Sequence, residues 1–151
     1  MLKRESTVAA KSFDTQSAPL ALLLLRILIG ALFITHLYWK FFVFRGGFFG
    51  WWAGFATNHY PWYTPYYVLS AEIVGALLII PGVWARWAAL YAVPMMAGAA
   101  QFWLARKGFY FVGGGAELPL VWCASLVLLA LLGDGPYALA PSPTPWKPRD
   151  R

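Results

Sequence analysis

Long apolar segments, separated by short polar or glycine-rich breaks, dominate the chain. They cover residues 18–44, 65–83, 84–104 and 116–132. A transmembrane helix needs about 20 apolar residues to cross a hydrocarbon core of roughly 30 Å. The pattern therefore predicts an all-α fold, an integral membrane four-helix bundle that occupies residues 18–135.

The segments around these spans are polar or irregular. Residues 1–17 are polar and mixed in charge, which predicts a solvated N-terminal tail. Residues 45–64 combine glycines with aromatic side chains, which predicts an aromatic loop at the outer membrane interface. Several prolines predict an extended, disordered tail over residues 136–151. The short break at Pro81-Gly82 predicts that the second and third spans form an antiparallel hairpin.

Composition and charge agree with a membrane protein. Hydrophobic residues make up 60% of the chain and charged residues only 12%, which excludes an ordinary soluble domain. Seven basic residues lie in the termini and the turn between spans two and three, and four lie on the opposite side. The positive-inside rule then places both termini in the cytoplasm, in a bacterial cytoplasmic (inner) membrane. Because topology accounts for the basic residues, we expect the lipid bilayer and no nucleic acid as a partner.

The residue inventory excludes several kinds of redox centre. A single cysteine cannot form an intrachain disulfide or a CxxC pair, and two histidines are too few for a structural zinc site. Haem ligation would need His36, in a span, to converge with His59, in a loop. We therefore expect no metal site and no covalently bound cofactor.

The first span carries ionisable side chains on one face. Arg26, His36 and Lys40 fall within one sector of a helical wheel together with Gly30. Because an ionisable group in hydrocarbon costs about 2.5–3.5 kcal/mol, this face must turn into the bundle. Gly30 should let a neighbouring helix approach closely.

Two acidic residues are candidate partners for this face. Counting about 1.5 Å per residue from the cytoplasmic end places Arg26 about 12 Å deep and Glu72 about 16 Å deep, which predicts an Arg26–Glu72 ion pair. Glu117, at the start of span four, is expected to reach Lys40 or His36. These five residues form the predicted internal polar site. It could bind a small ligand or relay protons, or it could only fix helix register.

The aromatic loop offers a second candidate contact. Quinone head groups stack on aromatic rings and accept hydrogen bonds from histidine and tyrosine, so His59 and Tyr60 are candidate quinone contacts. Aromatic side chains also gather at the headgroup layer without any ligand. A bound quinone is the only cofactor that the sequence suggests.

The pattern resembles the DoxX family of small four-span membrane proteins over residues 22–140. The matching residues are Leu25-Arg26, Gly30, Phe33, His36 and Lys40 in span one, Glu72, Gly75, Pro81-Gly82 and Arg86 around span two, and Gly113–Gly115, Glu117 and Gly133–Gly135 near span four. The chain departs from the family with Leu37 after the histidine and with Pro136–Ala140 after the last span.

The resemblance implies a role in membrane redox processes. The expected function is a membrane subunit or anchor of a quinone-linked or oxidant-defence redox system, without enzymatic activity of its own. Such a role implies a redox-enzyme partner or a homo-oligomer. The alternative is a small-solute or proton transporter that uses the Arg26–Glu72 layer, and a third possibility is a purely architectural role for the charges.

Overall fold

The computed structural model describes residues 2–143 and is helical over most of its length. Its elements are α1 (Leu2–Tyr38), the short π-helix η1 (Trp39–Val43), α2 (Gly47–Thr57), α3 (Thr64–Leu78), α4 (Ala85–Lys107), the 3₁₀ turn η2 (Phe111–Gly113) and α5 (Glu117–Leu132). Extended pairing among the described residues is limited to one bridge between Val83 and Ala140. The predicted all-α class is confirmed.

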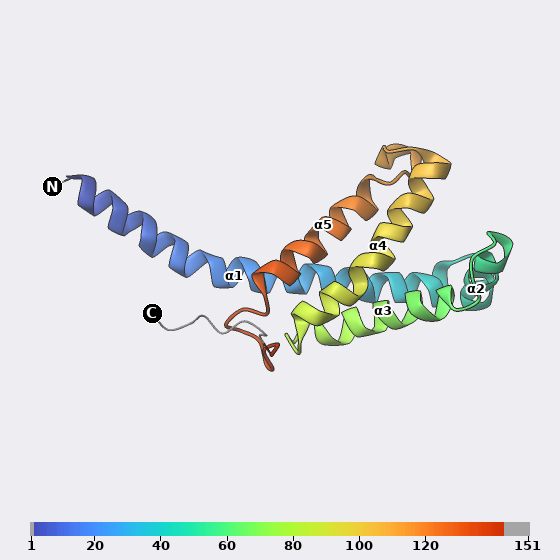
Figure 1. Ribbon diagram of the computed structural model, residues 1–151, viewed down its shortest axis with the longest axis horizontal. Coiled ribbons are helices and arrows are strands. Elements are labelled where there is room, and N and C mark those ends of the chain that lie inside the picture. Colours follow the sequence, from blue (N-terminus) through green and yellow to red (C-terminus); the bar gives the residue numbers. More distant parts are fainter. Residues whose placement is uncertain (1, 144–151) are drawn as a thin grey trace.

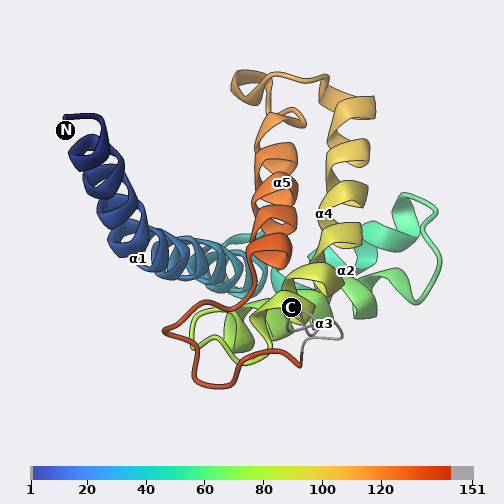
Figure 2. The same cartoon turned by 60° about the vertical axis from the view of Figure 1, so that its left-hand side comes forward.

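The helices pack as two pairs that cross each other. α1 lies beside α3 along the long axis of the molecule, and α4 and α5 form a hairpin that is inclined to that axis (Figures 1 and 2). α2 packs at the far end against η1 and α3. The N-terminal part of α1 projects away from the other helices (Figure 1).

Three segments differ from the expected organisation. The N-terminal segment is helical from Leu2, so α1 begins well before residue 18. Helix α2 lies inside the predicted loop 45–64, because aromatic residues such as Trp51 bury there. The predicted disordered tail is ordered over 136–143, and residues 144–151 lie outside the described part.

Two helices are long and apolar enough to cross a membrane. They cover Ser17–Val43 and Ala85–Lys107, and two shorter apolar helices are Thr64–Leu78 and Glu117–Leu132. These four helices correspond to the four predicted spans. Their outer faces carry exposed leucine, isoleucine and aromatic side chains, as expected of surfaces that meet lipid.

Glycines let α1 and α3 pack closely. The ring of Phe33, which is fully buried, occupies the place that a side chain at position 75 would take. In the same way, Ile80 lies where a side chain at position 30 would be. Gly30 thus makes room for the side chain of Ile80 in the turn that follows α3, and not for the backbone of a neighbouring helix.

Arg26 ties three parts of the chain together. Its side chain is 1% exposed. Its Nε donates to the carbonyl of Ile79 at 3.0 Å and its Nη2 to the carbonyl of Ile80 at 2.7 Å, so it caps the end of α3. Nη1 donates to the carbonyl of Asp134 at 2.8 Å and Nη2 also reaches that of Tyr137 at 3.4 Å. A planar guanidinium thus satisfies carbonyls that a helix end and a turn leave without partners.

The segment after α5 folds back across the turn between α3 and α4. The amide of Leu139 donates to the carbonyl of Pro81, and that of Trp84 to the carbonyl of Ala140. Both segments lie at the end of the molecule where α3 passes into α4 (Figure 1). The Arg26 hydrogen bonds therefore hold a small cap of backbone against the helices.

The Asp134 side chain also stabilises this cap of backbone. Oδ1 accepts from the amide of Arg86 at 3.0 Å and Oδ2 from the amide of Ser142 at 2.7 Å. Burial alone would raise the pKa of Asp134, but the amide hydrogen bonds outweigh it and hold that pKa below its ordinary value.

Replacing Arg26 should destabilise the fold strongly. We expect Arg26→Gln to lower the free energy of unfolding in detergent by at least about 3 kcal/mol, because several buried carbonyls lose a charged donor. Arg45→Gln is the control, since Arg45 is exposed and makes no side-chain hydrogen bond or ion pair with a described residue, and it should cost less than about 0.5 kcal/mol. Equal losses for both variants would contradict the capping role.

The stabilisation by Asp134 should depend on pH. Its folded pKa lies below the unfolded one, so its contribution is complete at neutral pH and is lost as the pH falls below about 4 towards the folded pKa. The stability difference between the wild type and Asp134→Asn should therefore narrow on acidification. Unfolding temperatures measured between pH 7 and pH 3 test this, and a pH-independent difference would contradict it.

Candidate functional site

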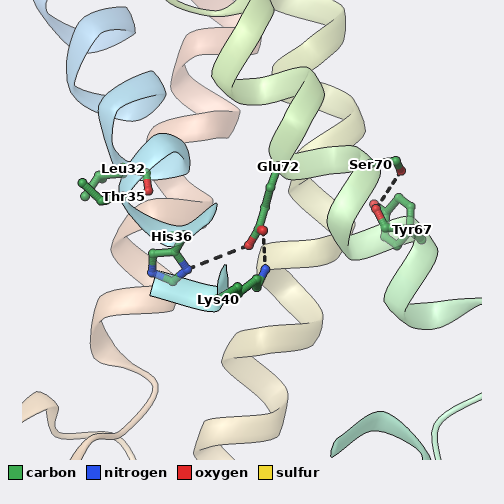
Figure 3. Close-up of polar contacts among 7 residues, drawn as sticks. All are labelled: Leu32, Thr35, His36, Lys40, Tyr67, Ser70 and Glu72. Atoms are coloured by element: carbon green, nitrogen blue, oxygen red, sulfur yellow. Dashed lines mark hydrogen bonds and ion pairs between the residues drawn. The ribbon is translucent and has the colours of Figure 1, made fainter. Parts of the chain in front are cut away.

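A buried lysine of η1 and a buried glutamate of α3 form an ion pair. Lys40 and Glu72 are each 3% exposed. The ammonium Nζ of Lys40 donates a short hydrogen bond to Oε2 of Glu72. Figure 3 shows the Glu72 side chain reaching from α3 towards both Lys40 and His36. Two opposite charges withdrawn from water in this way compensate each other.

The π-helix η1 brings Lys40 into the interior. The amide of Phe44 donates to the carbonyl of Trp39, five residues back, which widens the helix by one residue. Lys40 is the buried residue of this segment, whereas its neighbours Phe41 and Phe42 are 45% and 75% exposed. The widened turn therefore aims one cation inward and its aromatic neighbours outward.

His36 lies one turn before Lys40 on the other side of Glu72. Its Nδ1 is 3.9 Å from Oε1 of Glu72, beyond hydrogen-bond distance, and its side chain is 48% exposed. Lys40 occupies Oε2, so Oε1 is the oxygen of the buried pair that faces the imidazole. The site thus connects an enclosed charge pair to a half-exposed titratable ring on the outer face of α1.

Two tryptophans enclose the cluster. The Lys40 ammonium lies 4.3 Å from the ring centroid of Trp51, a cation–π contact with α2. The His36 ring lies 4.8 Å from Trp122 of α5 at 83°, an edge-to-face contact. Trp122 also packs against Phe33. Helices α1, α2, α3 and α5 therefore all contribute to the site.

The predicted Arg26–Glu72 ion pair is wrong. Arg26 donates to backbone carbonyls at the end of α3, whereas Glu72 binds Lys40. The depth argument failed because α1 begins at Leu2, so residue 18 does not mark where the helix starts. Glu72 lies near the middle of α3 and Arg26 lies level with its last residues, on an antiparallel neighbour.

Glu117 does not reach Lys40 or His36 as predicted. Its Oε2 accepts a hydrogen bond from the amide of Phe111 at 2.9 Å, in the loop that joins α4 to α5. This loop is the tip of the α4–α5 hairpin and lies apart from η1 (Figure 1). The internal site therefore consists of Lys40, Glu72 and His36, and Arg26 and Glu117 have separate structural roles.

His59 and Tyr60 follow α2 on the surface. His59 is exposed and has a positive φ of 59°. The Tyr60 ring lies 5.9 Å from Phe55 and 6.1 Å from Phe102, in an aromatic cluster between α2 and α4. His59 and Tyr60 therefore lie at the surface. The quinone contact expected of them stays a prediction.

Sequence reasoning missed Trp51 and Trp122 as neighbours of the charges. Trp51 sits in a segment rich in aromatic residues, and Trp122 is the one aromatic residue of the apolar helix α5, so the local pattern of neither points to the charges. Lys40 lies in η1 at the outer end of its span, whereas Glu72 lies near the middle of α3. Counting depth along the helices therefore does not by itself match these two residues.

Comparison with known proteins identifies one family. The DoxX family model matches residues 21–106, which include Arg26, His36, Lys40 and Glu72. Neither a curated protein nor a solved structure matches the chain.

Double-variant cycles should separate the two charge systems. Lys40→Met or Glu72→Gln alone should cost about 3–5 kcal/mol, because each leaves a buried partner uncompensated. The double variant Lys40→Met/Glu72→Gln should cost markedly less than the sum. The matched cycle of Arg26→Gln with Glu72→Gln should be additive within about 0.5 kcal/mol, because the two residues share no partner. Coupling in the second cycle and not in the first would restore the Arg26–Glu72 pair.

Proposed function

This chain belongs to the DoxX family of membrane proteins, and from this premise we propose that it is a quinone-binding membrane subunit of a redox system. We further propose that it is a multi-pass protein of the bacterial inner membrane with both termini in the cytoplasm. The observation that carries the proposal is the half-exposed His36 beside the buried Glu72–Lys40 pair.

The position of His36 suits a ligand that arrives from the lipid phase. The ring lies on α1 within the apolar Ser17–Val43 segment, so its exposed part faces hydrocarbon in a membrane. A quinone is a lipid-soluble molecule whose carbonyl oxygens accept hydrogen bonds. A neutral imidazole can donate one such bond, and the Trp122 ring beside it restricts how His36 turns.

The buried pair suits a reaction that consumes protons. A quinone supplies two-electron redox chemistry, and its reduction takes up protons. Oε1 of Glu72 lies 3.9 Å from Nδ1 of His36, and a closer approach of the two side chains lets the carboxylate accept a proton from the imidazole or return one to it. Lys40 holds Oε2 and keeps the carboxylate in place through the exchange.

The electrons must come from another protein in this proposal. We propose a redox enzyme as the partner, with this chain as its membrane anchor and quinone site. The transporter alternative relied on an Arg26–Glu72 layer, and that basis is lost because the two residues bind different partners.

Quinone binding by the purified protein tests the proposal. The wild type in mild detergent is titrated with decylubiquinone and, separately, with a short-chain menaquinone, and bound quinone is quantified after separation. We expect His36→Phe to weaken binding about tenfold, since one hydrogen bond of about 1.4 kcal/mol is lost. His36→Gln, which keeps a donor, should lose less.

His59→Phe is the matched control, because it removes the other histidine at an exposed site. It should leave binding unchanged. A loss with His59→Phe and none with His36→Phe would move the site to the His59–Tyr60 surface. Failure of the wild type to bind either quinone would overturn the proposal.

A further inference from the structure

Arg86 is the second arginine of the end where α3 passes into α4, and it is bonded very differently from Arg26. Among the described residues, its guanidinium has no hydrogen bond or ion pair, and its Nε is enclosed without a partner. The terminal nitrogens are not enclosed in this way. Arg86 therefore carries a half-buried charge whose outer nitrogens have no partner in the described part of the chain.

The backbone around α5 holds this side chain in position. A side chain at position 133 would collide with the Arg86 guanidinium, so Gly133, with its positive φ of 85°, lets the arginine fold over the end of α5. A guanidinium that is fixed by packing and left without an acceptor is preorganised for an anion.

Asp134 does not neutralise Arg86. Both of its carboxylate oxygens accept backbone amides, from Arg86 and Ser142. Arg26, whose Nη1 donates to the Asp134 backbone carbonyl, is a positive charge close enough to interact with the same carboxylate. Among the described side chains, the guanidinium groups of Arg26 and Arg86 and the carboxylate of Asp134 leave this end with an excess positive charge.

The surroundings of Arg86 are those of a membrane interface. Trp84 and Trp87, which flank it in the sequence, are 54% and 43% exposed. Tryptophan is enriched where a protein meets lipid headgroups. Arg86 lies in the first turn of α4, at the end of an apolar helix long enough to span a membrane.

We propose that Arg86 binds the phosphate of an anionic phospholipid headgroup at this interface. The planar guanidinium offers paired N–H donors to phosphate oxygens, and the exposed tryptophan rings pack beside the glycerol and upper acyl chain. The anion also offsets the cost of holding Arg86 half-buried and unpaired. This site is independent of the quinone proposal, because Arg86 follows the C-terminal end of α3, whereas Glu72 binds Lys40 near the middle of α3.

Lipid binding by the delipidated full chain tests the site. The protein is incubated with phosphatidylglycerol or phosphatidylcholine, and retained lipid is counted by native mass spectrometry. We expect Arg86→Gln to reduce phosphatidylglycerol retention about tenfold and Arg86→Lys to reduce it less. Arg106→Gln is the matched control, because Arg106 already binds Asn58 and stacks on Phe102, and it should not change retention.

Footprinting of the wild type keeps the test decisive if a variant fails to fold. Phosphatidylglycerol vesicles should protect Arg86 from phenylglyoxal, whereas phosphatidylcholine vesicles should not. Equal lipid loss for Arg86→Gln and Arg45→Gln would indicate general charge attraction and overturn the site. Complete displacement of the lipid by millimolar inorganic phosphate would overturn the lipid assignment in favour of a free-phosphate site.

Discussion

The fold depends on satisfying the charges of α1 without water. Arg26 and Lys40 both sit on the inward face of an apolar helix, and each is almost fully buried. Within hydrocarbon, such groups must find partners inside the protein. Arg26 finds backbone carbonyls at the end of α3 and in the segment after α5, and Lys40 finds Glu72. These two contacts set the register of α1 and η1 against α3, one directly after its last residue and one near its middle.

The buried charges of Arg26 and Lys40 are compensated in two different ways, and these differ in their chemical consequences. A guanidinium bonded to several neutral carbonyls has no proton to exchange, because arginine stays charged in proteins. The Arg26 guanidinium therefore has a structural role, because it holds the α3–α4 turn in place. The ammonium, carboxylate and imidazole of Lys40, Glu72 and His36 can all change protonation state, and one of them meets the outer surface. Arg26 thus has a structural role at the end of α3, whereas Lys40, Glu72 and His36 form the candidate chemical site.

Several features followed from local pattern. The apolar segments predicted the α-helical class and four of the helices, and Pro81-Gly82 predicted the break after α3. The resemblance carried by Arg26, His36, Lys40 and Glu72 predicted the family that the comparison shows. The cost of a charge in hydrocarbon indicated that these side chains face the interior, which the burial of Arg26, Lys40 and Glu72 confirms, whereas His36 is half-exposed.

The sequence by itself determined which residues must be buried and paired, because hydrophobicity and charge are properties of single side chains. Only the tertiary structure decided which partner each buried charged residue has. That choice depends on where α1 begins, on the extra residue in η1 and on the return of Asp134 and Tyr137 to the α3–α4 turn. Every residue has a backbone carbonyl, so no sequence pattern predicts that Arg26 will bind carbonyls. The partner of a buried charge is set by helix register and chain reversal, which are long-range features of the packed molecule.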